Sequence, residues 1–306
     1  MDQKTLEAKD KSVLKKVRPV NEPMPQDLNP PLSRDSYETL LSPNPPIFQE
    51  TFKVAHERLQ EVNFDPPGWL SYEEINLLKK FITLREKPIA FCEEERGLLK
   101  HSYGKPYKRP IMSHEPWQKK KIPIPKSILP QFTELIREII RTWLYEQSTS
   151  SYTSPTFCVA KSNVKVRIFH DLQELNKFTI KDAGLPPHIE EFVDAFSGRV
   201  CYVLGDIMGG YSERELDSTT RPLTTFVTPV GRIKLTILPQ GAISSVAVYQ
   251  AQMTWILQEE IPESLGIFID YGVIKGPRSL YNKEKLPENP SIRTSIWEYS
   301  IKLERI

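Results

Sequence analysis

The sequence predicts an α+β fold, in which helices alternate with antiparallel strand pairs. Strand–turn–strand patterns occur at residues 156–169 and 223–238, where β-branched and aromatic residues flank polar or Pro/Gly turns. Apolar residues with helical spacing precede and separate these patterns, most clearly at residues 127–145. All of these patterns lie between residues 116 and 281, so we expect the folded domain there.

The bulk composition excludes several classes of protein. The chain has 306 residues, enough to bury a sizeable core, and 41 Lys and Arg against 39 Asp and Glu give a net charge of only +2. Any nucleic-acid contact must therefore come from local basic patches. The three cysteines lack paired spacing, which argues against a disulfide framework or a zinc site.

The same composition bears on the cellular location. No apolar run approaches the roughly 18 residues that span a bilayer. The N-terminus is lysine-rich and polar and lacks the apolar core of a signal peptide. We therefore expect an intracellular protein, of the cytoplasm or the nucleus, with no membrane partner.

Two zones precede the expected domain. Residues 1–45 are charged and proline-rich without a hydrophobic period, and we predict a disordered tail. Residues 46–115 are predicted to be a poorly packed helical lead-in. Within it, Ser71 and Glu74 have the spacing of a capping box and are followed by apolar residues at helical spacing. The acidic run at 93–95 is expected to open a second short helix and is typical of a solvated face.

The first elements of the expected domain are a helix and a strand pair. Apolar residues at 127–145 follow the helical pattern and predict an amphipathic helix. Residues 156–160 and 166–169 predict two strands around a polar turn. A helix over 189–196 is expected to end at Gly198, because glycine readily adopts the left-handed conformation found after helix ends. The remaining predicted elements are a hairpin at 223–228 and 232–238 and a helix at about 244–259.

Two predicted strands end in acidic residues. The strand over 203–206 ends at Asp206, and Asp270 lies at the tip of a strand–turn–strand pattern over 268–273. Acidic residues at the ends of two apolar strands can meet at one edge of a sheet. Carboxylates that meet in this way can bring a divalent metal to a nucleoside triphosphate, as in a polymerase palm.

Several short motifs occur in order along this part of the chain. They are Pro116-Trp117 with Ile122-Pro123-Ile124-Pro125, Arg167-Ile168-Phe169-His170-Asp171-Leu172-Gln173-Glu174-Leu175-Asn176, Thr179-Ile180-Lys181-Asp182, Leu223-Thr224-Thr225-Phe226, Leu238-Pro239-Gln240-Gly241 and Lys275-Gly276-Pro277. Together they resemble the fingers and palm of a reverse transcriptase from a gypsy-type LTR retrotransposon, most like those of fungi. The resemblance covers somewhat more than half of the chain.

The resemblance implies a right-hand polymerase arrangement, with fingers and palm at 116–281 and an antiparallel sheet with helices on one face. It also implies that the thumb is absent, because the chain ends at Ile306, where thumb, connection and RNase H domains would follow. Residues 282–306 are accordingly expected to be a truncated tail where a thumb would begin. The implied activity is RNA-directed DNA synthesis by metal-dependent nucleotidyl transfer. The implied partners are an RNA/DNA primer–template, deoxynucleoside triphosphates and missing polyprotein domains (thumb, RNase H and integrase).

Asp206 and Asp270 match the first metal-binding aspartate of the palm and the first aspartate of the catalytic pair. The resemblance therefore implies that both are catalytic and hold Mg²⁺, with Mn²⁺ as an alternative. Carboxylates suit this hard ion, which prefers oxygen ligands and leaves room for phosphate oxygens. Without the surrounding motifs, Asp206 could equally be an ordinary acid at the end of a strand.

Four further residues match nucleotide-binding positions. Tyr211 matches the aromatic residue on which the incoming sugar rests, and Gln240 matches a glutamine that contacts the nucleotide. Lys161 and Arg167 match cations of the fingers that neutralise the triphosphate. The alternatives are a turn tyrosine, a structural role for the Leu-Pro-Gln-Gly turn, and two solvated strand cations. Basic residues at 119–121 and 126 could contact template phosphates or simply form a charged surface.

Three places depart from the family pattern, among them Trp143-Leu144, which stand where the family usually has a small residue. Tyr271 stands where the second aspartate of the catalytic pair belongs, and Glu213 replaces a glutamine and adds negative charge nearby. We therefore predict absent or impaired activity. The alternatives are a non-catalytic remnant that binds nucleic acid or protein, and a relic that does not fold stably. The Asp182-Ala183-Gly184 run resembles an aspartic-protease loop, but the Leu185-Pro186-Pro187 that follows fits polymerase fingers better.

Overall fold

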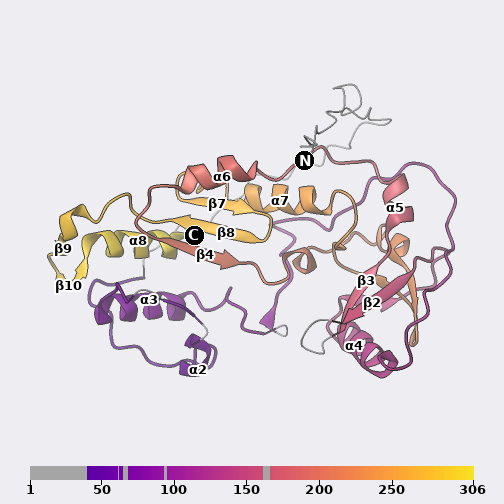
Figure 1. Cartoon of the computed structure of the whole chain (residues 1–306), viewed down its shortest axis with the longest axis horizontal. Coiled ribbons are helices and arrows are strands. Elements are labelled where there is room, and N and C mark those ends of the chain that lie inside the picture. Colours follow the sequence, from indigo (N-terminus) through magenta and orange to yellow (C-terminus); the bar gives the residue numbers. More distant parts are fainter. Residues whose placement is uncertain (1–39, 61, 65–67, 93–94, 161–165) are drawn as a thin grey trace, which may run out of the picture.

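The computed structural model describes residues 40–60, 62–64, 68–92, 95–160 and 166–306. Within these residues the fold is α+β, as predicted, and its strands form four small sheets with antiparallel pairing (Figure 1). The predicted disordered tail lies almost entirely outside the described residues. No helix in the described part of the chain has both the length and the apolar content that crossing a membrane requires.

One three-stranded sheet carries both predicted aspartates. Its strand order is β4 (Tyr202–Asp206), β8 (Tyr271–Lys275) and β7 (Leu265–Phe268), so β8 is central. Helices α6 (Ile189–Phe196) and α7 (Ser245–Ile256) lie along one side of it (Figure 1). The ring of Phe192 lies 5.7 Å from that of Phe268, which seats α6 on the sheet.

The predicted end of helix α6 is confirmed. After Phe196 the backbone reaches Gly198 with φ of +70°, a left-handed conformation that glycine adopts without steric penalty. A Cβ atom on Gly266 of β7 would collide with the ring of Phe196, so the close approach of helix and strand requires glycine there too. These two glycines allow the chain to turn back under α6 and enter β4.

A second three-stranded sheet forms an apolar core with one further helix and residues of α7. The strands are β1 (Tyr145–Gln147), β6 (Gly231–Leu235) and β5 (Phe226–Thr228), in that order. Helix α4 (Leu129–Arg141) packs on them through Phe132 and Ile136, which are fully buried. Burying such side chains is the main favourable contribution to folding.

The predicted helix over 127–145 is too long at its C-terminal end. Helix α4 ends at Arg141, and Trp143 adopts a positive φ of 63° with its side chain 80% exposed. This break lets Tyr145 start strand β1 and pair with Leu235 of β6. The apolar period continues past the helix end because Leu144 and Tyr145 belong to the same core.

The predicted hairpin at 156–169 is confirmed. Strand β2 (Thr156–Ala160) pairs with β3 (Val166–His170), and the predicted turn at 161–163 lies outside the described residues. The short helix α5 (Gln173–Phe178) follows and was not predicted.

The first arm of the hairpin predicted at 223–238 is shorter than expected. Leu223 and Thr224 belong to a 3-10 helix, η3 (Arg221–Thr224), so the strand begins only at Phe226. The Thr224 hydroxyl donates to the carbonyl of Arg221 at 2.7 Å, which closes this helical turn. Pro222, early in the turn, has the backbone torsion that a helix start requires.

The lead-in contains α2 (His56–Leu59) and α3 (Tyr72–Leu84). The predicted capping box is confirmed, since the N–H of Glu74 donates to the Ser71 hydroxyl at 3.2 Å and the Ser71 N–H donates back to the Glu74 carboxylate at 2.9 Å. Of the second short helix expected to open at 93–95, only Glu95 is described, and it has 3-10 geometry, while residues 96–100 have no regular structure. Residues 93 and 94 lie outside the described ranges.

The expectation of a poorly packed lead-in is also wrong. Leu41 and Leu77 form a buried cluster with Ile292 from the C-terminal segment. That segment folds as η4 (Tyr281–Lys283), β9 (Lys285–Leu286), β10 (Asn289–Arg293) and α8 (Thr294–Arg305). Residues 282–306, expected as a truncated tail, are thus packed against the lead-in. The domain boundaries inferred from the sequence stay a prediction.

Candidate functional site

Asp206 and Asp270 lie at the same end of their sheet. Asp206 ends β4 and is paired directly with Tyr271, the first residue of β8. Asp270 precedes Tyr271 in the turn, and its carbonyl accepts the N–H of Ile207 at 2.8 Å. Asp206 is exposed and Asp270 partly exposed, so both carboxylates are accessible from solvent. The two strand ends therefore meet as predicted, while the metal-binding role of the two acids stays a prediction.

A buried glutamine holds the hairpin that carries Asp270. The side-chain oxygen of Gln250, on α7, accepts the N–H of Ile269 at 2.7 Å, and its amide nitrogen donates to the carbonyl of Ile267 at 3.0 Å. Ile269 has a positive φ of 58°, which is strained for a β-branched residue. Gln250 thus stabilises the turn that presents Asp270. The sequence signal for it was a glutamine within a largely apolar helix, and we assigned it no role.

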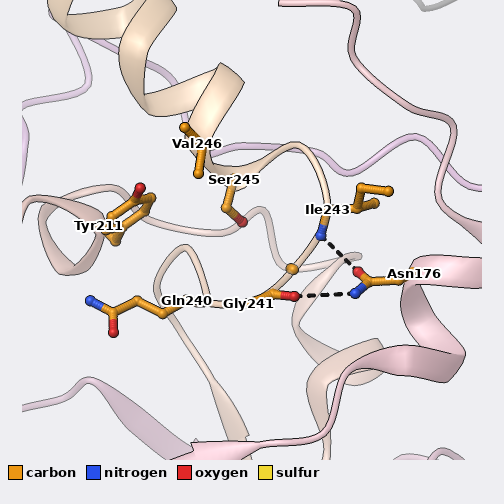
Figure 2. A pocket seen from close by; sticks show the side chains of 8 residues that line it. Asn176, Tyr211, Gln240, Gly241, Ile243, Ser245 and Val246 are labelled. Carbon is orange, nitrogen blue, oxygen red and sulfur yellow. Dashed lines mark hydrogen bonds between the residues drawn. The ribbon is translucent and has the colours of Figure 1, made fainter. Parts of the chain in front are cut away.

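A pocket of about 390 Å³ brings together two of the predicted nucleotide-binding residues. Figure 2 shows Tyr211 and Gln240 on one side of it and Asn176 on the other, with the start of α7 between them. The lining residues are Asn176, Tyr211, Gln240, Gly241, Ala242, Ile243, Ser245 and Val246. The pocket is therefore built from α5, the turn after Asp206, the Leu-Pro-Gln-Gly turn and the first residues of α7.

Two side chains brace the pocket loop from different elements. Asn176 donates to the carbonyl of Gly241 at 3.1 Å and accepts the N–H of Ile243 at 2.7 Å (Figure 2). Arg109, from the lead-in, donates to the carbonyl of Ile243 at 2.6 Å and to the hydroxyl of Ser245 at 3.4 Å. Arg109 is 3% exposed, and burial lowers the pKa of its guanidinium. We assigned neither side chain a role from the sequence.

The pocket and the aspartates share one electrostatic environment. Burial raises the pKa of Tyr211, and the charge of Asp270 adds to the shift. Burial also raises the pKa of Glu213, against the opposing effect of Arg96. Arg96 donates to the carbonyl of Gly209 at 3.1 Å, so a lead-in cation contacts the turn between Asp206 and Tyr211. The added negative charge expected from Glu213 is thus offset by burial and by this arginine.

Of the two predicted cations of the β2–β3 hairpin, only Arg167 lies within the described residues. Arg167 is exposed on β3, its guanidinium lies 5.6 Å from the centre of the Phe169 ring, and it does not line the pocket. Lys161 lies outside the described residues. Of the basic residues at 119–121, Lys119 is paired with Glu174 at 2.7 Å. The roles of Arg167 and Lys161 stay predictions.

The donor set suits a loosely held hard cation. Tyr271, opposite Asp206, is 45% exposed and offers a neutral phenol in place of a carboxylate. No group of three or more His, Cys, Asp or Glu side chains that could hold a metal gathers in the described part of the chain. Two accessible carboxylates fit an ion that keeps several water ligands, as Mg²⁺ usually does. They do not form a closed protein cage.

The Asp182-Ala183-Gly184 segment, which resembles a protease loop, has a local structural role. The Asp182 carboxylate accepts the N–H of Gly184 at 2.7 Å, and the Asp182 N–H donates to the hydroxyl of Ser244 at 3.0 Å. These contacts tie a turn to the start of α7, next to the pocket loop.

No protein-family model matches the chain. It is 26% identical over 199 residues to the retrovirus-related Pol polyprotein from transposon 412 of Drosophila melanogaster, a match covering 63% of this chain and 16% of that polyprotein. The enzymatic polyprotein of Cestrum yellow leaf curling virus is 26% identical over 239 residues, which cover 74% of this chain and 35% of that polyprotein. The relatives of this chain are retrotransposon and viral polyproteins. The chain spans only a minor part of the length of each.

Solved structures share the fold. The prototype foamy virus protease–reverse transcriptase aligns with a TM-score of 0.63 at 19% identity, covering 77% of this chain and 30% of that protein. The foamy viral protease–reverse transcriptase in complex with double-stranded DNA aligns with a TM-score of 0.63 over 84% of this chain and 51% of that protein, also at 19% identity. The α+β fold of this chain is therefore one that occurs in viral reverse transcriptases.

Proposed function

We propose that this chain is a reverse transcriptase-like domain of a gypsy-type retroelement polyprotein, with a fingers and palm arrangement and impaired catalysis. The observation that carries the proposal is the meeting of Asp206 and Asp270 at one sheet end, next to a pocket lined by Tyr211 and Gln240. The relatives, which are Pol and enzymatic polyproteins, support the same assignment.

In this proposal each residue has a chemical task. Asp206 and Asp270 hold Mg²⁺, or Mn²⁺ in its place, which when bound neutralises the phosphates and activates the primer 3′-hydroxyl. The ring of Tyr211 supports the sugar of a deoxynucleoside triphosphate, and the Gln240 amide contacts the nucleotide. Asn176 and Arg109 hold the loop that carries Gln240 in place. Preorganised groups of this kind contribute to the rate by positioning the reacting atoms.

The proposed partners are an RNA/DNA primer–template and other domains of a retroelement polyprotein. Foamy viral enzymes of the same fold have been solved with double-stranded DNA and with an RNA/DNA hybrid, which supports nucleic acid as the partner. With a net charge of +2, binding would depend on local basic residues and weaken steeply with salt.

Tyr271 is the reason for the proposed impairment. Phosphoryl transfer needs metal ions that bridge the reacting oxygens, and each carboxylate lost removes one ligand and one negative charge. The Tyr271 phenol stands directly across the strand pair from Asp206, where it leaves the site with too few acidic ligands.

Primer extension tests the proposal. The full chain and its Tyr271→Asp variant are compared on a primed RNA template with Mg²⁺ or Mn²⁺. We expect little or no incorporation by the natural sequence and a clear gain in the variant. Adding Asp206→Asn to Tyr271→Asp should abolish that gain. Incorporation by the natural chain that is unaffected by Asp206→Asn would contradict the assigned site.

A second candidate function is a non-catalytic nucleic-acid-binding remnant, and Tyr271 is the observation that favours it. In that case the chain binds an RNA–DNA duplex, Asp206→Asn does not change the affinity, and Tyr271→Asp restores no synthesis. Filter binding at two salt concentrations, run beside the extension assay, separates the two candidates.

A further inference from the structure

The hydroxyl of Tyr249 is buried beneath the turn that follows Asp206. Tyr249 lies on α7 and is 2% exposed, and in the part of the chain that the structure describes its Oη has no hydrogen-bond partner. A Cβ atom on Gly210 would collide with this Oη, so the hydroxyl lies against the backbone of the turn. Native proteins rarely leave a buried hydroxyl unpaired, because such a group destabilises the fold. It is therefore a donor available to an acceptor near the turn.

The turn above this hydroxyl connects both aspartates. It begins directly after Asp206, and the N–H of Gly210 closes it by donating to the carbonyl of Ile207 at 3.2 Å. Ile207 in turn donates its N–H to the carbonyl of Asp270 at 2.8 Å. The Tyr249 hydroxyl therefore lies against a turn whose backbone is hydrogen-bonded to the hairpin that carries Asp270.

The surroundings keep Tyr249 protonated and therefore a donor. Burial raises the pKa of its phenol, and the negative charges of Glu213, Asp270 and Asp206 raise it further. Its ring also lies 5.2 Å from that of Tyr211, which lines the pocket. A neutral phenol among carboxylates can donate to their oxygens, and carboxylates are the strongest acceptors available in a protein.

We propose that Tyr249 is a positioning residue, whose hydroxyl donates its one hydrogen bond to a carboxylate oxygen of Asp206 or Asp270 when the two acids hold a divalent cation. The inference rests on the proposed function, because it needs that cation site. Carboxylates that bind metals are usually held by such outer hydrogen bonds, and losing one typically weakens metal affinity by 10- to 100-fold. This donor matters more here because Tyr271 supplies no second carboxylate at the hairpin.

The test is Mn²⁺ binding by the full chain, measured from the electron paramagnetic resonance signal of free Mn²⁺. The variants are Tyr249→Phe, which removes only the hydroxyl, Asp206→Asn, and Tyr299→Phe as a matched control. Tyr299 is a buried tyrosine whose hydroxyl donates to the carbonyl of Ile274 at 3.1 Å. We expect Tyr249→Phe to weaken Mn²⁺ binding about tenfold. Its Tm without metal should equal or exceed that of the natural chain, because an unpaired group has been removed.

The control separates a loss of packing from a loss of binding. Tyr299→Phe should lower Tm and leave Mn²⁺ affinity at the natural value. If Tyr249→Phe binds Mn²⁺ as the natural chain does while Asp206→Asn loses binding, the cation site exists and the role of Tyr249 is wrong. If Asp206→Asn also binds as the natural chain does, the proposed function fails and this inference fails with it. A Tm drop in Tyr249→Phe at unchanged affinity would show a purely structural hydroxyl and also overturn the proposal.

Discussion

Glu74 and Arg293 form a buried ion pair that joins the lead-in to the C-terminal segment. The Arg293 guanidinium lies 2.6 Å from the Glu74 carboxylate, and the two side chains are 14% and 1% exposed. The same guanidinium lies 3.9 Å from the centre of the Trp69 ring. Because Glu74 also completes the capping box of α3 with Ser71, one carboxylate fixes both a helix start and a segment 219 residues away.

Glu74→Gln should lower the free energy of unfolding by about 3 kcal/mol, because it leaves the guanidinium of Arg293 buried without its counter-ion. Urea denaturation followed by circular dichroism measures the change. Glu73→Gln, one residue earlier and exposed, is the matched control and should change stability by less than about 0.5 kcal/mol. Equal stability of the two variants would show that the ion pair contributes nothing.

The ion pair should also make the free energy of unfolding depend on pH in the acidic range. Burial alone would raise the pKa of Glu74, but hydrogen bonds from Arg293 and Ser71 and the charge of Arg293 lower it overall. A depressed pKa in the folded state means that the contribution is complete above the ordinary value of 4.5 and is lost as pH falls through the folded value. Glu74→Gln should therefore remove part of the acid sensitivity below about pH 4.5, as seen in urea midpoints measured across that range.

His170 should make the protein less stable between neutral pH and pH 5. Its ring nitrogens lie 2.8 Å from the Tyr145 hydroxyl and 3.2 Å from the Thr156 hydroxyl, and burial lowers the pKa of the imidazole from 6.5 to about 3. Between these two pKa values the unfolded chain binds a proton that the folded chain does not. The free energy of unfolding therefore decreases as the pH is lowered. The expected loss from pH 7 to pH 5 is up to about 2 kcal/mol.

His170→Gln should flatten this dependence, although its stability at pH 7 will be lower because the packing against Phe226 changes. The same substitution at the exposed His188 controls for the loss of one histidine from the unfolded chain. Urea unfolding at pH 7, 6 and 5 measures the slopes. A slope for His170→Gln equal to that of the natural chain would show that the imidazole titrates alike in both states.

Gly210→Ala should destabilise the fold by about 1–3 kcal/mol, because its Cβ would collide with the phenol of Tyr249. Gly97→Ala is the control, since a Cβ there meets no atom within 4 Å. Thermal melts of the two variants give the comparison. In a Tyr249→Leu background the effect of Gly210→Ala should shrink, and an unchanged effect would place the steric conflict elsewhere.

Local patterns were the most predictable part of the fold. The capping box at Ser71 and the β2–β3 hairpin depend on residues close together in the chain, and both occur as expected. The end of α4 was not predictable, because Tyr145 leaves the helical path to pair with Leu235, a contact made 90 residues later. An apolar period shows which side chains are buried but not which backbone partner they take.

The candidate site likewise has features that the sequence predicts and features that it does not. The placing of Asp206 beside the turn that carries Asp270 could be predicted because the first acid ends an apolar strand and the second follows one. The supports of the site could not, since Asn176 and Arg109 act by hydrogen bonds to backbone carbonyls far along the chain. A carbonyl is present at every residue, so the sequence carries no signal for which carbonyl a polar side chain will reach.

Gln250→Leu should loosen the hairpin that presents Asp270. The substitution keeps the side-chain volume roughly constant but leaves the N–H of Ile269 and the carbonyl of Ile267 without the side-chain amide they contact. Removing a partner from buried polar groups lowers the free energy of unfolding by about 1–3 kcal/mol. The strained backbone of Ile269 should then relax, and hydrogen exchange of its amide should accelerate more than that of the amides in strand β4.

Gln258→Leu is the control, because this glutamine is exposed and lies just after the end of α7. It should leave the exchange rate of the Ile269 amide unchanged. Equal exchange rates at Ile269 in all three proteins would show that the turn is held by its own backbone, and that α7 does not position Asp270.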